Sequence, residues 1–417
     1  MTVMIAGAGI AGLTLGLALH RLGIPFRIHE AVAEVAPLGV GINVQSHAVR
    51  ELFALGLEDV LDDIGVRTRD YGFYTTSGRE IWVEPRGRSA GYDWPQYSIH
   101  RGRLQVALVD ALIERAGADV LHTGRRLEGY ATGRDGVVAR FSTPDGASVE
   151  EKAEALIAAD GIRSAARAQA NPHEGEPIWN GAILWRGTTR AAPFKSGASM
   201  ILAGHDTLRF VAYPITGVDD RGDATINWIA ETRVDPSLPR AREDWNRAVD
   251  PVEFAPAFAG WRFDWLDVPG LIAGAERVFE YPMVDREPLE RWTDGRVSLI
   301  GDAAHPTYPV GSNGASQAII DACVLAAKLA AHDTVPAALD AYEAEIRPVA
   351  TRIQRANRGA GPDAILQRVH DLSGGVFDRI EDVIPHDELA AHAERYKHPA
   401  GYTVEQVNAA RPVVGAP

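Results

Sequence analysis

Residues 1–30 read MTVMIAGAGI AGLTLGLALH RLGIPFRIHE, and this opening stretch decides the fold. The apolar run at residues 3–6 predicts a short β-strand, and the GAGIAG that follows at residues 7–12 matches the pattern GxGxxG. A leucine-rich helix comes next, and a second strand at residues 26–30 ends on Glu30. This order of strand, glycine turn, helix, strand and acid predicts a dinucleotide-binding unit.

Each glycine of the turn has a physical role in such a unit. Gly7 allows the tight turn, Gly9 lets the backbone approach a pyrophosphate, and Gly12 allows the helix to pack closely on the strand. Free N–H groups at the start of the helix face the anion. Glu30 lies eighteen residues after Gly12, close to the spacing of an acid that accepts a hydrogen bond from a ribose hydroxyl. A glycine-rich turn without a ligand is the alternative, and the complete context disfavours it.

The composition is that of a globular protein of two or three domains. A formal net charge of -14 and a pI near 5.4 disfavour a nucleic-acid surface or an anionic membrane as partner. Cys323 is the only cysteine, which excludes an internal disulfide and a cysteine-based metal cluster, and we expect no metal site. No run of eighteen apolar residues occurs, so we expect a cytoplasmic protein without a membrane-spanning helix.

The rest of the chain indicates a first domain that is interrupted by an inserted sheet. Apolar patterns predict helices at 46–55 and 101–116, strands at 70–83 and 119–122, and hairpin strands at 126–143 and 148–158 around the Asp145-Gly146 turn. Short β-type runs from about 175 to 283 predict a second sheet, with a helical stretch near 242–258. A buried strand returns at 297–300, before helices at 315–332 and 337–358.

These patterns predict three domains. They are a discontinuous cofactor-binding domain at residues 1–70, 98–174 and 284–335, a substrate-binding sheet domain at 71–97 and 175–283, and a C-terminal helical segment at 336–417.

Two later motifs make the prediction more specific. AADGIRS at residues 158–164 places Asp160 and Gly161 at the end of an apolar strand, and GDAAHP at residues 301–306 begins with Gly301 and Asp302 in the same way. In this order, the three motifs resemble those of the single-component FAD-dependent aromatic hydroxylases, the para-hydroxybenzoate hydroxylase type. The resemblance covers essentially the whole chain.

The resemblance implies an α/β fold, with a discontinuous Rossmann-like FAD-binding domain of the GR2 type, an inserted mixed or antiparallel β-sheet substrate domain, and C-terminal helices. It implies bound FAD, with NADH or NADPH as a transient co-substrate, because no second GxGxxG is present. NAD(P)H would reduce FAD, dioxygen would add at flavin C4a, and the resulting hydroperoxide would hydroxylate an aromatic or heteroaromatic small molecule.

The resemblance also implies which residues hold FAD. Asp302 would accept a hydrogen bond from a ribityl hydroxyl, or it would cap the next helix. Arg101 would lie against the pyrophosphate, with Gln105 one turn along the same helix face. Leu127 would contact adenine through its backbone, or it is a core residue, and Asp160 would contact FAD or is a turn aspartate. The full expected set is Gly7, Gly9, Ile10, Ala11, Gly12, Glu30, Ala31, Gly41, Arg101, Gln105, Leu127, Asp160, Gly161, Gly301, Asp302, Pro309, Gly311, Ser312, Asn313, Gly314 and Ala315.

The residues expected near the reaction are Pro309, His305, Arg209 and Tyr213. Period-2 alternation puts Arg209 and Tyr213 on one face of a strand, where Arg209 would meet a substrate carboxylate or the flavin edge, or would form a surface salt bridge. Tyr213 would pack on an aromatic ring or belong to the core. His305 would act as a general base, or would pack and cap the loop. Tyr71, Tyr74 and Trp185 are either cavity or core residues.

One departure from the family pattern points to a subgroup. The chain has PVGSNGASQ at residues 309–317, so Ser316 stands where an asparagine is usual. This string, with Tyr396-Lys397 and Ala400-Gly401-Tyr402, is similar to the subgroup of the phenazine monooxygenase that hydroxylates 5-methylphenazine-1-carboxylate.

Two alternative functions stay open at this point. One is an FAD oxidase or dehydrogenase that inserts no oxygen, and the other is a flavin-binding protein without catalysis. The expected partners are an aromatic small molecule and dioxygen, and the sequence leaves open the nicotinamide cofactor and whether the protein is a monomer or a dimer.

Overall fold

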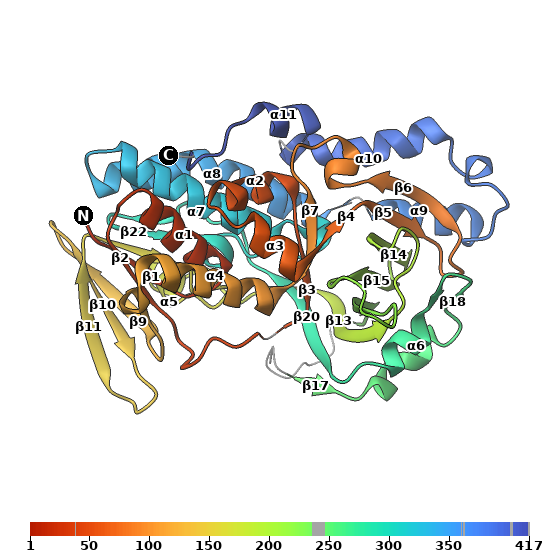
Figure 1. Cartoon of the computed structure of the whole chain (residues 1–417), viewed down its shortest axis with the longest axis horizontal. Coiled ribbons are helices and arrows are strands. Elements are labelled where there is room, and N and C mark those ends of the chain that lie inside the picture. Colours follow the sequence, from red (N-terminus) through yellow and green to blue (C-terminus); the bar gives the residue numbers. More distant parts are fainter. Residues whose placement is uncertain (38, 236–246, 360, 362, 401–402, 416–417) are drawn as a thin grey trace.

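The computed structural model describes the whole chain except residues 38, 236–246, 360, 362, 401–402 and 416–417, and it describes no side chains at 395–400. Figure 1 shows two large β-sheets side by side, with the C-terminal helices lying along one edge of both. The expected motif residues Tyr396-Lys397 and Ala400-Gly401-Tyr402 lie outside the residues whose side chains are described.

The first sheet has six strands and is parallel except at one edge. Its strand order is β21-β22-β12-β1-β2-β8, and only β21 and β22 pair antiparallel. The bounds are β1 (Val3–Ala6), β2 (Phe26–His29), β8 (Leu121–His122), β12 (Ala155–Ala158), β21 (Thr293–Asp294) and β22 (Val297–Leu299). Helix α1 (Ile10–Arg21) packs against α4 (Arg101–Ala116) and α7 (Gly314–Ala331). The strand, turn and helix predicted at the N-terminus are confirmed.

Strand β1 is the point at which the order of this sheet reverses. The chain leaves β1 through α1 to β2 on one side, whereas β12 and β22, which come later in the sequence, lie on the other side. Ligands of open α/β sheets bind at such a point, beyond the carboxyl ends of the strands. In this chain that position is occupied by the glycine turn at residues 7–12.

The prediction of a buried strand at 119–122 was wrong in extent. Residues Ala118–Val120 form a short 3-10 helix, and only the half-buried pair Leu121–His122 forms the edge strand β8. The hairpin at Asp145-Gly146 is confirmed, in a separate antiparallel sheet of β9 (Arg126–Thr132), β10 (Val137–Ser142) and β11 (Ser148–Ala153). The residues after β11 leave the hairpin and enter the parallel sheet as β12.

The second sheet has eight strands in the order β17-β20-β13-β16-β15-β14-β5-β6. It is antiparallel except where β14 pairs with β5, so the predicted mixed sheet is confirmed. The bounds are β5 (Asp70–Tyr74), β6 (Glu80–Pro85), β13 (Ile178–Ala191), β14 (Ser199–His205), β15 (Leu208–Pro214), β16 (Ala224–Arg233), β17 (Ala248–Val249) and β20 (Val278–Asp285).

A segment between β17 and β20 covers one face of this sheet. It contains the 3-10 helices Pro251–Glu253 and Ala255–Phe258, the short strands β18 (Arg262–Phe263) and β19 (Leu266–Asp267), and helix α6 (Val268–Ala273). Its apolar side chains join those of the sheet, including Trp185 and Trp228, in one buried cluster. The helical stretch predicted near 242–258 is therefore two 3-10 helices after residue 250, and residues 242–246 lie outside the described part.

A small sheet links the two large ones. It has the order β3-β7-β4, with β3 (Gly41–Val44), β7 (Gln96–His100) and β4 (Gly65–Thr68), and all its pairs are antiparallel. Helices α2 (Ser46–Ala54) and α3 (Glu58–Ile64) pack beside β7. The backbone N–H of Gly41 donates a hydrogen bond to Asn227 Oδ1 (2.6 Å), which joins β3 to the eight-stranded sheet.

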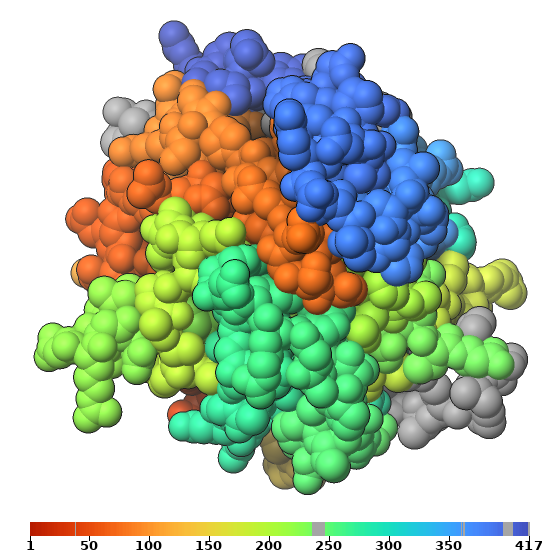
Figure 2. Space-filling model, turned by 90° about the vertical axis from the view of Figure 1, so that its right-hand side faces the viewer, coloured from red at the N-terminus to blue at the C-terminus, as the bar shows by residue number. Residues whose placement is uncertain are grey.

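The C-terminal helices complete the fold. They are α8 (Val335–Arg358), α9 (Ala364–Ser373), α10 (His386–Ala400) and α11 (Val404–Ala409), with a 3-10 turn at Ile380–Asp382. Ile365 and Leu366 of α9 and Leu389 of α10 pack on Phe73 and Ile81 of the eight-stranded sheet. Figure 2 shows these helices in blue against the orange strands near residues 71–85. The division into three domains at the predicted boundaries stays a prediction.

The stretch Val310–Ala331, which contains α7, is long and apolar enough to span a membrane by composition. Within its most apolar window 61% is buried inside the protein, and α7 packs against both α1 and α8. Helix α7 is therefore a buried core helix of the protein.

Candidate active site

The glycine turn between β1 and α1 has the geometry of a phosphate cradle. Gly7 has a φ of +106°, and a Cβ on it would lie 2.4 Å from the carbonyl oxygen of Ala159. A Cβ on Gly12 would lie 2.0 Å from the carbonyl oxygen of Gly7, so only glycine fits at either position. At Gly9 a Cβ would meet nothing within 4 Å, which leaves the backbone open to a ligand at the start of α1.

Two side chains brace this turn from opposite sides. Glu30 accepts hydrogen bonds from the N–H groups of Ala8 (2.6 Å) and Val32 (2.9 Å). Gln105 Nε2 donates to the carbonyl oxygen of Ala8 (2.7 Å). A carboxylate has more acceptor positions than these two bonds use, so Glu30 can still accept from a ribose hydroxyl. Gln105 acts on the turn from behind and does not line the cavity.

Asp160 and Gly161 follow β12 at the same end of the sheet. Asp160 Oδ2 accepts a hydrogen bond from the N–H of Ala165 (2.8 Å), where the short helix α5 (Ala165–Ala170) begins. This contact is the one that a turn aspartate makes, although Asp160 Oδ1 is buried without a partner among the described residues. Burial raises the pKa of the Asp160 carboxyl. Gly161 lines the cavity and has a φ of +80°.

Asp302 presents a carboxylate to the cavity. It lies in the 3-10 turn Gly301–Ala303, is exposed on the cavity side, and has no hydrogen bond from any residue that the structure describes. Protein surrounds the carboxylate elsewhere, and this desolvation raises its pKa. The N-cap of α7 is Asn313, so Asp302 does not cap that helix. An acceptor without a protein partner is suited to a ligand hydroxyl.

The loop before α7 forms the next part of the cavity wall. Pro309, Gly311 and Ser312 line the cavity, and α7 begins there with Gly314. Gly311 and Ser312 both have positive φ angles, 70° and 55°, which turn the chain sharply before the helix. The first N–H groups of α7, with the positive end of its dipole, are therefore available to an electron-rich ligand.

Ser316, the departure from the family pattern, has a structural contact. It is fully buried in the first turn of α7, and its Oγ accepts a hydrogen bond from the N–H of Gln45 (2.9 Å). Gln45 is the N-cap residue of α2. Ser316 thus ties the start of α7 to the start of α2.

His305 is buried below the loop and does not line the cavity. Its Nε2 lies 2.5 Å from Asp321 Oδ2, and the same carboxylate oxygen accepts the N–H of Gly301 (2.8 Å). Burial opposes protonation of His305, but the charge and hydrogen bond of Asp321 outweigh it, so the pKa of the imidazole lies above its ordinary value. These contacts fit the packing role that was weighed against a general base.

One face of the eight-stranded sheet forms the opposite wall. The period of two along each strand brings cavity-lining side chains from β5, β14, β15, β16, β13 and β20 to the same face. They are Tyr71, Met200, Leu202, Arg209, Val211, Tyr213, Ile229, Glu231, Leu184, Arg186 and Met283. The predicted alternation of Arg209 and Tyr213 is confirmed, whereas Tyr74 and Trp185 lie in the buried cluster on the other face.

Arg209 is buried rather than at a surface salt bridge. Its Nη1 pairs with Asp363, its Nη2 pairs with Asp206 (2.7 Å), and Glu231 Oε1 lies 4.0 Å away. Desolvation alone would lower the pKa of Arg209, but Asp363 and Glu231 raise it above the ordinary value. Tyr213 is buried beside Gly41, where a Cβ would approach its ring to 2.8 Å.

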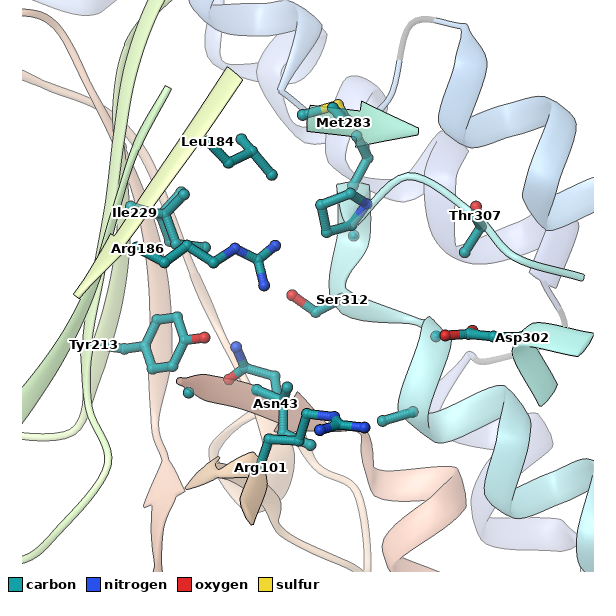
Figure 3. Close-up of a pocket in the computed structure, with 18 of the residues that line it drawn as sticks. Asn43, Arg101, Leu184, Arg186, Tyr213, Ile229, Met283, Asp302, Thr307 and Ser312 are labelled. Carbon is teal, nitrogen blue, oxygen red and sulfur yellow. The ribbon is translucent and has the colours of Figure 1, made fainter. Parts of the chain in front are cut away.

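Sequence reasoning missed Arg186. It lies among the short β-type runs predicted from about 175 to 283, two residues after Leu184, so the same period-2 rule would have placed both on the cavity face. Figure 3 shows the guanidinium extending from the sheet into the cavity, toward Ser312. Asn43 and Thr307 were also missed, because each comes from a loop or short strand without a motif.

The predicted residues divide into two sets. Those that line the cavity are Gly9, Ile10, Ala11, Gly41, Arg101, Gly161, Arg209, Tyr213, Asp302, Pro309, Gly311, Ser312, Gly314 and Ala315. Those that do not line it are Gly7, Gly12, Glu30, Ala31, Gln105, Leu127, Asp160, Gly301, His305 and Asn313. Leu127 is a buried core residue of β9, and its backbone contact with adenine stays a prediction.

The cavity between the two walls has a volume of about 340 Å³, within the range of ~300–1,000 Å³ that small-molecule sites occupy. The described residues include no group of three or more His, Cys, Asp or Glu placed to hold a metal ion. The open backbone at Gly9, the unpartnered Asp302 and the start of α7 fit a dinucleotide with a flavin ring. When bound, such a cofactor supplies redox chemistry and the activation of dioxygen.

Comparison with known proteins agrees with this site. The family described as FAD binding domain matches residues 1–250 and 276–357. The chain is 45% identical over 362 residues to phenazine 1,6-dicarboxylic acid hydroxylase PhzS of Lysobacter antibioticus, covering 85% of this chain and 89% of that protein. It is 34% identical over 360 residues to aurachin C monooxygenase/isomerase of Stigmatella aurantiaca, covering 86% of each.

A solved structure has the same fold. Klebsiella pneumoniae HpxO, complexed with FAD and uric acid, superimposes with a TM-score of 0.73 at 23% identity, covering 98% of this chain and 96% of that chain. At this identity the likeness concerns the fold alone.

Proposed function

This chain belongs to the FAD-dependent aromatic hydroxylases, and we propose that its substrate is a phenazine that carries a carboxyl group. As a member of this family the protein is a flavin monooxygenase, which uses FAD, NAD(P)H and dioxygen to hydroxylate an aromatic small molecule. The observation that carries the substrate proposal is the similarity to the Lysobacter protein, whose name gives a phenazine dicarboxylic acid.

The shape and chemistry of the sheet wall support an aromatic substrate. Leu184, Ile229 and Met283 offer an apolar surface on which a flat ring system can pack, and Tyr213 adds an aromatic ring. The same apolar side chains disfavour water in the space that faces the loop before α7. Exclusion of water by these side chains would protect the chemistry of a bound cofactor from side reactions with solvent.

For the cofactor we propose a path along the wall formed by the first domain. The pyrophosphate would lie at the turn around Gly9, beside Arg101, and Glu30 would accept from the adenosine ribose. Asp302 would accept from a ribityl hydroxyl, and the start of α7 would face the flavin ring. Pro309 would lie between the flavin and the substrate.

Within this proposal Arg209 and Tyr213 contact the substrate end of the cavity, and His305 holds the loop in place through Asp321. A cytoplasmic location is also proposed, because the reaction consumes NAD(P)H and the single cysteine, Cys323, is buried and unpaired by a disulfide.

A substrate panel tests the proposal. The purified enzyme is given NADH or NADPH with phenazine-1-carboxylate, phenazine-1,6-dicarboxylate, unsubstituted phenazine, salicylate and 6-hydroxynicotinate in turn. We expect a carboxylated phenazine to give the largest stimulation of NAD(P)H oxidation, with a hydroxylated product in mass spectra. Strong stimulation by salicylate or 6-hydroxynicotinate, with none from any phenazine, would reject the proposed substrate and leave the family assignment intact.

A further inference from the structure

Arg186 lines the cavity, and the proposed function gives this arginine no role. It lies on β13, with Ile229 of β16 directly opposite and Leu184 two residues earlier on the same face. Figure 3 shows its guanidinium directed into the cavity, between the sheet and the loop that carries Ser312. The surrounding side chains on the sheet are mainly apolar.

Among the residues that the structure describes, no carboxylate forms an ion pair with the guanidinium of Arg186. Its Nε is buried without a hydrogen bond, and no ion pair joins Arg186 to any residue that the structure describes. Its guanidinium carbon lies 5.4 Å from the centroid of the Tyr281 ring, and Glu231 acts on it only through the longer-range field. Burial lowers the pKa of Arg186, which means that the site disfavours the bare cation. Arg186 is half-buried, and a partly desolvated charge of this kind is stabilised when an opposite charge joins it.

The other cavity arginine on the sheet differs in this respect. Arg209 is already paired with Asp363 and Asp206, and Glu231 lies beside it. Burial raises the pKa of Glu231, and no hydrogen bond reaches its Oε1 within the described residues. A substrate carboxylate placed beside Arg209 would meet the acidic side chains of Glu231 and Asp363 in the cavity wall. It would not meet an unpaired cation there, because Arg209 is already paired.

The separation of the two ends follows from the strand register. Glu231 is paired with Leu184 and Arg209, whereas Arg186 is paired with Ile229, so the acidic end is two residues along the strands from Arg186. Two residues of a strand span about 6.6 Å, which is on the scale of a fused ring system. The sheet wall of the cavity therefore presents one unpaired cation and one acidic end to a flat ligand, whereas Arg101 lies on the opposite wall.

We propose that Arg186 is the binding subsite for a carboxylate on the aromatic substrate, and that the cavity prefers a monocarboxylate to a dicarboxylate. This inference rests on the proposed function for its ring system. The planar guanidinium offers two parallel N–H donors to a carboxylate, and the low polarity around it strengthens that pair. The preference follows because a second carboxylate on the far side of the ring would lie toward Glu231 and Asp363.

Binding measurements on the FAD-loaded enzyme test the inference without turnover. Perturbation of the flavin absorbance gives Kd for phenazine-1-carboxylate, for its neutral carboxamide and for phenazine-1,6-dicarboxylate, in the unaltered enzyme and in Arg186→Gln, Arg186→Lys and Arg190→Gln. Arg190 is a matched control, since it lies on the same strand but is exposed and paired with Asp219. FAD content and the flavin reduction potential are measured for each variant.

We expect the unaltered enzyme and Arg190→Gln to bind the carboxylate about 10- to 100-fold more tightly than the carboxamide, as the loss of a hydrogen bond to a charged group implies. Arg186→Gln should reduce that ratio to near one with FAD content unchanged, and Arg186→Lys should keep part of it. The dicarboxylate should bind more weakly than the monocarboxylate.

An unchanged carboxylate-to-carboxamide ratio in Arg186→Gln would overturn the inference, as would a loss of FAD that accounts for the weaker binding. If no phenazine binds, the proposed substrate has failed, and the same ratio is then measured with salicylate and salicylamide. In that case a preference for salicylate over salicylamide that is lost in Arg186→Gln supports the carboxylate subsite. A preference that is unchanged in Arg186→Gln overturns the proposed subsite.

Discussion

Replacement of Asp302 should weaken FAD binding without lowering the stability of the apoprotein. In the structure its carboxylate faces the cavity and accepts no hydrogen bond from the described residues, so Asp302→Ala breaks no bond within the protein. A hydrogen bond to a charged group contributes about 1.5–3 kcal/mol, which corresponds to a rise in the Kd for FAD of about 10- to 150-fold.

Replacement of Asp302 should affect the stability of the apoprotein in the opposite direction to FAD binding. The pKa of Asp302 is raised by desolvation in the folded state, so the folded protein binds its proton more readily than the unfolded chain does. Ionised Asp302 therefore destabilises the apoprotein at neutral pH, and this cost disappears as the pH falls below the usual range of an aspartate. Asp302→Ala should leave the Tm of the apoprotein unchanged or raise it at pH 7. Asp302→Asn should have the same effect on the Tm of the apoprotein.

The assay combines two measurements on apoprotein prepared by removal of FAD. Titration with FAD, followed by quenching of flavin fluorescence, gives Kd, and thermal unfolding at neutral and acid pH gives the stability. Asp264→Ala is the matched control, because Asp264 is exposed and lies outside the cavity. An unchanged Kd for FAD, or a large fall in the Tm of the apoprotein, would refute the reasoning.

Three further predictions concern residues behind the cavity wall. Gly12→Ala should lose FAD and lower Tm sharply, because its Cβ would meet the carbonyl oxygen of Gly7; normal flavin content would contradict this. His305→Asn should keep substrate-stimulated NAD(P)H oxidation. Its loss of stability should be largest below about pH 6.5, because Asp321 raises the pKa of His305 in the folded state. The stabilisation by the protonated imidazole then fades as the pH rises through that folded-state pKa. Thermal unfolding across pH checks this, and a loss that grows with pH argues against it. Ser316→Ala should cost about 1 kcal/mol in the free energy of unfolding through its lost backbone bond, measurable by denaturant titration, and no change would count against that bond's contribution.

Local signals in the sequence predicted the parts of the fold that depend on neighbouring residues. The strand at Val3–Ala6, the helix at Arg101–Ala116 and the Asp145-Gly146 turn agree with expectation, because apolar period, glycine and turn residues act over a few positions. The strand expected at 119–122 was shortened, because its chain forms a 3-10 turn before it reaches the sheet edge.

The cavity itself depends on contacts that no local pattern records. Arg209 pairs with Asp363, which lies 154 residues later, and the surface salt bridge considered from the sequence became a buried one. Arg186 reaches the cavity because β13 pairs with β16 in a particular register. His305 belongs to the GDAAHP motif, but its side chain faces Asp321 rather than the cavity. The reason is that helix α7, which supplies Asp321, packs against the loop. Each of these outcomes depends on tertiary packing.

The central claim is that the protein is an FAD monooxygenase acting on an aromatic compound, and isotopic labelling tests it most directly. The FAD-loaded enzyme is supplied with NAD(P)H, a carboxylated phenazine and dioxygen enriched in the heavy oxygen isotope, and the product is analysed by mass spectrometry. The account predicts that the hydroxylated product carries one heavy oxygen atom from dioxygen. Oxidation of NAD(P)H with all of the heavy oxygen recovered in hydrogen peroxide, for every aromatic compound supplied, would contradict it.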